Sequence, residues 1–197
     1  MKVELLTLPM SLKKMEYIAA LAALTCRGNT DKVFVPCQVL ARIIKAGHES
    51  ILEHINLTYS VKGLSRACLQ EVARHRHISL SVESTRHTLR KHLENEQWME
   101  HLVEGKRPAQ RDLLYDLVNL AKIFDEDNDE LKYFLPEFWP TNLILTSNVR
   151  ELRHILKLRT APAALKEFRD LARAMYEAVP ETFRYLLRDC VYEEKNQ

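Results

Sequence analysis

Ile55-Asn56-Leu57-Thr58-Tyr59-Ser60-Val61-Lys62-Gly63 is the stretch that decides the fold class. Apolar and polar side chains alternate along it, which is the pattern of a strand with one buried face, and Gly63 is expected to end the strand. From Leu64 to about Ile78 the apolar residues return at helical spacing, with Cys68 and Val72 on one stripe. Together with the helical periods elsewhere, this alternation predicts an α+β protein, mostly helical with a small antiparallel sheet.

The remaining elements are predicted from the same periods and from their end signals. Before the central strand, a strand at 2–8 is expected to end at Pro9, Ser11 is expected to cap a helix that runs to about Cys26, and a second helix runs from Pro36 to a cap at Gly47. After it we expect a loop at 79–85, a helix at about 108–124, a strand at 143–146 and a helix at 148–159. Two further helices are expected to begin at Pro162 and at Pro180, the first carrying Leu165, Phe168, Leu171 and Met175.

Composition limits the class of protein. The 197 residues suffice for one filled domain, predicted to span 1–197, and only 4 of them are glycines, so long flexible linkers are not expected. The formal net charge of +2 is small for a dedicated nucleic-acid binder. None of the 4 cysteines forms a CxxC pair, and no apolar run is long enough to span a bilayer or to serve as a signal peptide. We therefore expect a cytoplasmic protein that binds neither nucleic acid nor membrane.

The segment 74–87 is unusually rich in polar groups, with three arginines, three histidines and three serines. These side chains offer many hydrogen-bond donors and little packing value, and only Glu83 interleaves an acid, so the segment favours an anion-binding site over a plain basic surface. A metal site is not predicted. His75 and His77 would point to nearly opposite sides of a helix, and His48 and His54 have no supporting Cys or close Asp.

The same segment resembles the signature of the flavin-dependent thymidylate synthases, the ThyX family, written RHRxxSxNxxSxRY. Six positions match, at Arg74, His75, Arg76, Ser79, Ser84 and Arg86. Upstream, the residues at 47–54 resemble the family's GHxSxxEH element, and downstream 148–152 with Leu158-Arg159 resemble its NxRxL…LR element. The resemblance covers roughly residues 36 to 180, with three motifs in the family's order.

Membership in this family would imply a homotetramer with sites at subunit interfaces. It would also imply FAD as cofactor, conversion of dUMP to dTMP, methylenetetrahydrofolate as carbon donor and NADPH as reductant. By position, the residues expected to contact FAD are Ser50, Glu53, Arg74, His75, Arg76, Asn148, Arg150 and His154. Those expected to surround dUMP are Glu71, Arg74, Glu83, Ser84, Thr85, Arg86, Lys132 and Arg159.

The resemblance also implies a chemical role for several of these residues. Arg86 and Lys132 would neutralise the dUMP phosphate through charge-assisted hydrogen bonds. Arg159 would be the catalytic residue, a fixed cation that favours loss of the uracil imide proton. Ser84 is interpreted as a phosphate ligand and not as a nucleophile, because no general base stands near it in sequence. Cys68 is expected to be packed, and His75, between two arginines, is not expected in a buried apolar setting.

Departures from the family pattern keep alternatives open. Ser81 and His87 replace the signature's asparagine and tyrosine, and Val82 stands where many members carry a glutamate. Elsewhere Glu71, Lys132 and Leu165 replace a frequent glutamine, arginine and glutamine. A flavin-dependent hydroxymethylase of uracil nucleotides is the nearest alternative. A nucleic-acid-binding module using the arginines is another, which the lack of an aromatic stacking platform near them disfavours.

Overall fold

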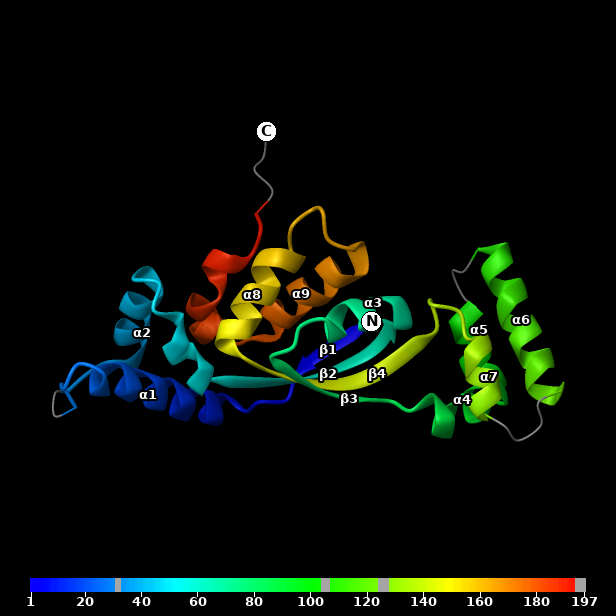
Figure 1. Cartoon of the computed structure of the whole chain (residues 1–197), viewed down its shortest axis with the longest axis horizontal. Helices are drawn as coiled ribbons and strands as arrows, with labels where there is room; N and C mark the ends of the chain where they lie inside the picture. Colours follow the sequence, from blue (N-terminus) through cyan, green and yellow to red (C-terminus); the bar gives the residue numbers. More distant parts are fainter. Residues whose placement is uncertain (31–32, 104–106, 124–127, 194–197) are drawn as a thin grey trace. The chain divides into compact units, whose positions relative to one another are not determined.

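The structure is a computed structural model of the whole chain, and it describes residues 1–30, 33–103, 107–123 and 128–193 (Figure 1). Its helices, 3-10 helices and strands, in chain order, are β1 (Lys2–Leu5), α1 (Pro9–Thr25), α2 (Pro36–Lys45), η1 (Glu49–His54), β2 (Asn56–Ser65), α3 (Arg66–Ala73), β3 (Ile78–Val82), α4 (Thr85–Leu93), α5 (Glu96–Val103), α6 (Pro108–Ile123), α7 (Asn128–Leu131), η2 (Lys132–Phe134), β4 (Pro140–Asn148), α8 (Val149–Arg159), α9 (Lys166–Ala178), η3 (Glu181–Leu186) and η4 (Arg188–Cys190). The predicted α+β class is confirmed. No helix among these residues is both long and apolar enough to cross a membrane.

The backbone groups into two compact units. Unit 1 takes the described parts of residues 1–64, 68–81 and 142–197, and unit 2 takes those of 65–67 and 82–141. Each unit has its own hydrophobic core, and each is described by itself below. That the whole of 1–197 is a single domain stays a prediction.

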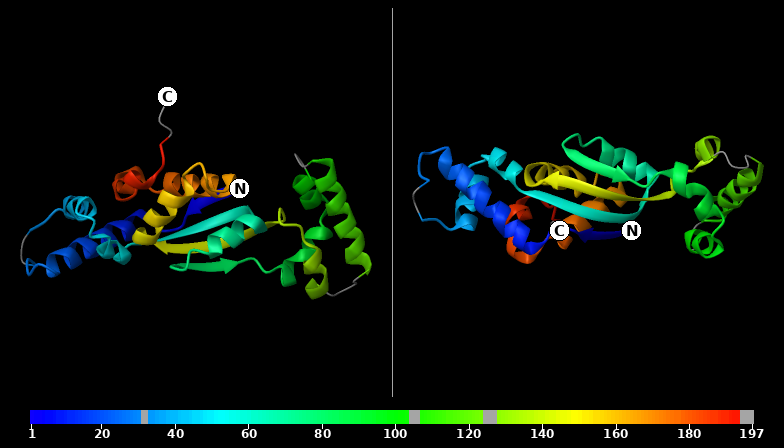
Figure 2. Two further views of the ribbon diagram at one scale, coloured as in Figure 1. Left: turned by 45° about the horizontal axis from the view of Figure 1, so that its top comes forward. Right: turned by 90° about the horizontal axis from the view of Figure 1, so that it is seen from below.

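Unit 1 is organised by a four-stranded sheet of order β1-β2-β4-β3 (Figures 1 and 2). β1 pairs antiparallel with β2, with Leu5 opposite Tyr59. The inward residues predicted for the central strand, at 55, 57, 59 and 61, are all buried, and they share one core with α8 and α9 on the same face of the sheet. Alternation therefore located this strand and its buried face correctly.

Gly63 was predicted to end the central strand, but it lies within that strand. β2 continues to Ser65, and Gly63 adopts the left-handed backbone conformation at φ +73°. Its N–H donates to the Asn142 side-chain oxygen of β4 at 3.0 Å. Because glycine accepts positive φ at little cost, the strand can continue past this position to Ser65.

The predictions for 64–85 need two corrections. The helix there is α3, which ends at Ala73, although Cys68 and Val72 are buried as expected. The segment predicted as a loop begins with β3, the strand that lies beside β4 in the sheet. Only two apolar residues of β3, Ile78 and Leu80, pack against the core, so its alternation is too short to separate a strand from a polar loop.

Three of the element boundaries that were predicted from prolines are wrong in whole or in part. Pro9 is the first residue of α1, with Leu8 as its N-cap, so Ser11 lies inside the first turn and β1 ends at Leu5. The fixed φ of proline and its missing N–H suit that first position. Pro162 lies in a turn before α9, whose N-cap is Leu165, 46% exposed and not inward. Pro180 is the N-cap of η3, a 3-10 helix.

Unit 2 is helical, and three of its α-helices, α4, α5 and the short α7, were not predicted. Its core is built around Trp139, with buried residues from several helices: Leu89, Leu93, Met99, Leu102, Leu114, Leu117, Ala121 and Leu131. The predicted helix at 108–124 is α6, confirmed through Ile123, and its expected end at Phe124 lies outside the described residues.

Candidate functional site

A polar cleft of about 540 Å³ opens in unit 1 where η1 faces the first turns of α8. Its lining residues are Glu49, Glu53, His77, Asn148, Arg150, Glu151, His154 and Lys157. Four of them, Glu53, Asn148, Arg150 and His154, were predicted as cofactor contacts from two motifs far apart in the sequence. The structure brings these four together.

The wall of this cleft is built by the local structure of α8. Asn148 is the N-cap, and its side-chain oxygen accepts from the Glu151 backbone N–H at 2.8 Å, so the helix begins at a defined residue. Arg150, His154 and Lys157 then follow at i, i+4 and i+7, which places them on one face of the helix. Arg150 forms an ion pair with Glu53 of η1, and both side chains stay about half exposed to the cleft.

His75 lies behind this wall, and the prediction that it avoids a buried apolar setting is wrong. The residue is only 7% exposed, and its ring meets the Phe168 ring edge-on at 5.7 Å between centroids. Both ring nitrogens are nevertheless bonded. Nδ1 lies 3.0 Å from Glu151 Oε1, and Nε2 accepts from Arg159 Nε at 3.1 Å. These two polar partners on α8 offset the cost of burying the ring.

Arg159 is held from a second side by Glu71 of α3. Its Nη1 donates to Glu71 Oε2 at 3.0 Å, while the other Glu71 oxygen accepts from Arg74 at 3.2 Å. Burial alone raises the pKa of Glu71, but the adjacent guanidinium groups of Arg74 and Arg159 outweigh it and leave the pKa below its ordinary value. The guanidinium carbon of Arg159 also lies 4.7 Å from the Phe168 ring centre. Predicted substrate and cofactor residues thus form one connected network.

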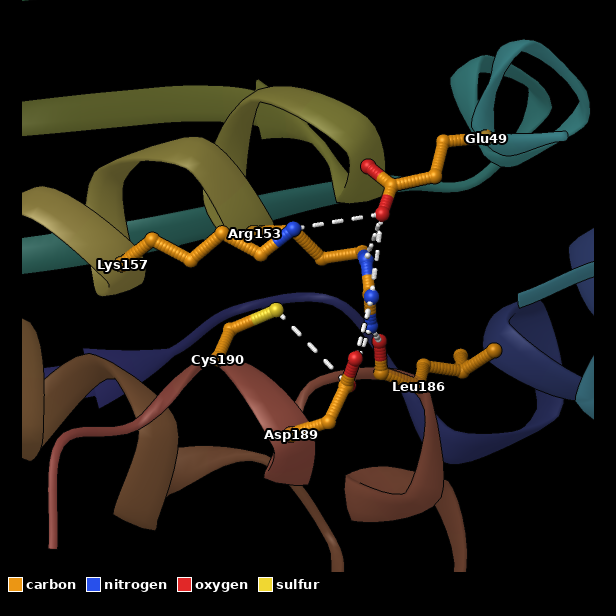
Figure 3. A network of polar contacts seen from close by, with 6 residues as sticks. All are labelled: Glu49, Arg153, Lys157, Leu186, Asp189 and Cys190. Atoms are coloured by element: carbon orange, nitrogen blue, oxygen red, sulfur yellow. Dashed lines mark hydrogen bonds and ion pairs between the residues drawn. The ribbon is translucent and has the colours of Figure 1, made fainter. Parts of the chain in front are cut away.

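A buried arginine of α8 contacts the cleft residue Glu49 and two further elements (Figure 3). Arg153 is 1% exposed and donates to Glu49 of η1, to the Leu186 carbonyl and to Asp189 of η4. It was not predicted, although its place on the apolar face of α8, between Val149 and Leu156, is a usable signal. A charged side chain on a buried helix face needs partners.

In unit 2, Asp129 brings together the two predicted phosphate ligands. Arg86 Nη2 lies 2.6 Å from Asp129 Oδ2, and Lys132 Nζ lies 2.9 Å from Oδ1. The hydrogen bond from Lys132, with the charge of Arg86, lowers the pKa of Asp129 below its ordinary value. Two cations therefore share one carboxylate, an arrangement that an anion can also bridge.

The other predicted substrate residues of unit 2 stand at the start of α4. Ser84 is the N-cap, its side chain makes no capping hydrogen bond, and Thr85 begins the helix. The Glu83 carboxylate lies 2.6 Å from His92 Nε2, so His92 holds it. The predicted substrate residues are thus divided between the units, with Glu71, Arg74 and Arg159 in unit 1.

Some predicted residues lie outside these networks, and some network residues were missed. Ser50 and Arg76 are exposed in unit 1 and do not line the cleft. Glu49, Glu151 and Lys157 do line it but were not predicted, although helical spacing from Arg150 points to Lys157. Cys68 is packed as expected, and burial raises the pKa of its thiol to about 12. Among the described residues, no three metal-binding side chains come together.

Comparison with known proteins gives one consistent result. Residues 7–183 match the family described as thymidylate synthase complementing protein. The chain is 40% identical over 182 residues to the flavin-dependent thymidylate synthase of Campylobacter jejuni, covering 86% of this chain and 85% of that protein. The enzyme of the same name from Wolinella succinogenes is 42% identical over 161 residues, covering 76% and 78%. A crystal structure of ThyX from Helicobacter pylori with FAD and dUMP superimposes with a TM-score of 0.83 at 34% identity, covering 98% of this chain and 100% of that one.

Proposed function

This chain belongs to the thymidylate synthase complementing protein family, and from that membership we infer that it is a flavin-dependent thymidylate synthase. It converts dUMP to dTMP with FAD as cofactor. The observation that carries the assignment is the meeting of Glu53 and Arg150 in one cleft. These residues come from two separate elements of the family pattern, and their ion pair joins η1 to α8.

The cleft suits a flavin cofactor in size and chemistry. Its volume of about 540 Å³ falls within the range typical of small-molecule sites. Arg150, His154 and Lys157 offer donors to phosphate and ring-edge oxygens, and the N-terminus of α8 adds the positive end of a helix dipole. We assign FAD contacts to Glu53, Asn148, Arg150 and His154 on this basis. For Ser50, Arg74, His75 and Arg76 the assignment rests on the sequence resemblance.

The chain's own residues bind, orient and polarise, while FAD supplies the hydride chemistry when bound. Arg159 holds its positive charge at the uracil imide, where it stabilises the deprotonated ring. Its guanidinium is fixed by hydrogen bonds to His75 and Glu71 before substrate arrives, so little reorganisation is needed. Arg86 and Lys132 neutralise the dUMP phosphate, and Ser84 adds a hydroxyl donor.

The co-substrates and the assembly belong to the same proposal. Methylenetetrahydrofolate provides the carbon, NADPH reduces the flavin, and the protein acts in the cytoplasm as a homotetramer with sites at subunit interfaces. Native mass spectrometry tests the tetramer. Mixing inactive Arg74→Ala and Lys132→Ala proteins, with subunit exchange confirmed, tests the shared sites. Recovery of turnover is expected. If a site takes Arg74 from one chain and Lys132 from another, some sites in the mixed assembly contain both wild-type residues.

Titration with FAD tests the cofactor site. Saturable quenching of flavin fluorescence is expected for the apo-protein, with weaker binding for Arg150→Leu because a charged donor at the cleft is lost. Arg42→Leu, an exposed position on α2, is the matched control and should bind as the wild type does. Equal affinity of all three proteins would remove Arg150 from the site, and no saturable change would remove the flavin assignment.

Anaerobic turnover with dUMP, methylenetetrahydrofolate and NADPH tests the reaction. Mass spectrometry of the product distinguishes dTMP, which carries a methyl group, from a hydroxymethyl nucleotide. We expect dTMP. A hydroxymethyl product would assign the chain to the sister reaction on the same scaffold.

A further inference from the structure

We propose that Glu151 is a positioning residue for Arg159 and that it acts by selecting the tautomer of His75. The expected effect on turnover rests on the proposed function, whereas the expected tautomer of His75 does not depend on it. Glu151 and Arg159 lie about two turns apart on α8, so they point to the same side of the helix. His75, in the turn after α3, lies within hydrogen-bonding distance of both side chains.

The tautomer follows from what each atom can donate. Arg159 Nε carries a hydrogen and has no lone pair to offer, so His75 Nε2, at 3.1 Å, must be the acceptor. A neutral imidazole with a bare Nε2 carries its proton on Nδ1. That nitrogen lies 3.0 Å from Glu151 Oε1, and a carboxylate can only accept there. The two hydrogen bonds are therefore donated in the same direction: Arg159 donates to His75, and His75 donates to Glu151.

The surroundings keep the ring neutral and keep water from replacing its partners. The His75 and Glu151 side chains are only 5% and 10% exposed. Burial lowers the pKa of His75, Arg159 and His154 lower it further, and Glu151 opposes them without reversing the shift. From α9, the uncharged ring of Phe168 packs edge-on against the His75 ring. The neutral form needed to accept from Arg159 is thus the favoured one.

Glu151 itself is fixed independently of His75. Its backbone N–H is held by the Asn148 side chain in the first turn of α8, where a carboxylate is also favoured by the helix dipole. Without this carboxylate the proton of His75 could move to Nε2. Two donors would then face each other between His75 and Arg159, and the guanidinium would have to turn away. The hydrogen bond that Arg159 would keep, from Nη1 to the partly exposed Glu71, fixes only one terminal nitrogen of the guanidinium.

The first experiment determines the tautomer in the wild-type protein, whatever its activity. Two-bond nitrogen–hydrogen correlation spectra of protein labelled with ¹⁵N-histidine distinguish protonated from bare ring nitrogens. We expect His75 with a protonated Nδ1 and a bare Nε2 at neutral pH. His75→Gln assigns the signal, and if that variant does not fold, single variants of each of the other histidines among the 8 in the chain assign it by elimination. A proton on Nε2, or on both nitrogens, overturns the proposal.

The second experiment tests the consequence for Arg159 with three variants. Glu151→Gln keeps an oxygen that accepts from Nδ1–H, so it should keep the tautomer and most of the turnover. Glu151→Leu removes the acceptor, should give mixed tautomers and should lower kcat by up to about 100-fold, the cost of misplacing a reacting group. Glu181→Gln, at an exposed site on η3, is the control for losing one carboxylate.

The pH profile separates positioning from a merely structural role. The loss in Glu151→Leu should shrink as pH rises, because an ionising uracil ring depends less on Arg159. A wild-type tautomer and an unchanged pH profile in Glu151→Leu would falsify the proposal. If the protein made no dTMP at all, the proposed function would fail while the wild-type tautomer spectrum still decided the assignment of Glu151 and His75.

Discussion

Arg153 and Asp189 are joined by two parallel hydrogen bonds of 2.6 Å, one from each terminal nitrogen of the guanidinium to each carboxylate oxygen. The same guanidinium also reaches Glu49 through Nε at 3.1 Å and Nη2 at 3.0 Å (Figure 3). A single side chain of α8 thus ties η1, at the edge of the cleft, to η4 near the end of the described chain. Such bidentate pairs are among the stronger ionic contacts in proteins.

Arg153→Met should destabilise unit 1 substantially. The methionine side chain fills much of the arginine's volume, but Asp189 and the Leu186 carbonyl lose the guanidinium donor, and Glu49 keeps only the longer contact from Lys157 at 3.4 Å. Breaking a buried pair costs about 3–5 kcal/mol, and because Asp189 is half exposed we expect the lower end, about 3 kcal/mol. Chemical denaturation measures the change in the free energy of unfolding. Lys166→Met removes an exposed pair with Asp170 and should stay within about 1 kcal/mol. Equal effects would show that Arg153 is not a structural clamp.

The same clamp predicts the shape of acid unfolding. Burial raises the pKa of Glu49, but Arg153 and Lys157 outweigh it and lower the pKa below 4.5; the hydrogen bond from Arg153 lowers the pKa of Asp189 below 3.8. Groups with depressed folded-state pKa values stabilise the protein above their unfolded values. That stability is lost as pH falls through the folded values. The free energy of unfolding should therefore fall below about pH 4.5 in the wild type, and less steeply in Arg153→Met. Parallel slopes would contradict the assignment of these shifts to Arg153.

How far sequence patterns predict this fold depends on how many periods an element contains. β2 and α8 bury one face over several periods, so their type and inward residues were predicted correctly, although β2 continues past Gly63 to Ser65. β3 has only two packed apolar residues, and its identity as a strand comes from pairing with β4, which no local pattern contains. Helices α4 and α5 bury few residues each, which is why their period was missed.

The sequence predicts candidate site residues but not the contacts among them. Matching motifs predicted Glu53 and Arg150, which meet in the cleft. The burial of His75 could not be predicted, because it depends on Glu151 and Arg159 arriving from a distant helix to satisfy both nitrogens. Likewise, the role of Asp129 depends on a fold-specific meeting of α4, α7 and η2.

Arg159→Lys keeps the positive charge but not the planar fork. A lysine ammonium cannot reproduce the paired contacts to His75 Nε2 and Glu71 Oε2, so the charge loses its fixed orientation. We expect kcat for dTMP formation to fall about 10- to 100-fold, equivalent to one lost hydrogen bond to a charged group, roughly 1.5–3 kcal/mol. The deficit should narrow as pH rises and the uracil imide ionises unaided. A deficit independent of pH would make Arg159 a binding residue without a role in ionisation.

Asp129→Asn should tighten dUMP binding. The ionised Asp129 occupies donors of Arg86 and Lys132 that the phosphate would use, and it repels the phosphate with an energy of about 1 kcal/mol for each unit of phosphate charge at contact distances in water. Its benefit, holding two exposed cations in place, is worth no more than that. Removing both the competition and the repulsion predicts a dissociation constant about three- to tenfold lower by calorimetry, with a smaller gain at high salt. Asp112→Asn, an exposed change on α6, controls for net charge and should leave affinity unaltered. Weaker binding would instead mean that Asp129 preorganises the cations, and unchanged binding would place the phosphate elsewhere.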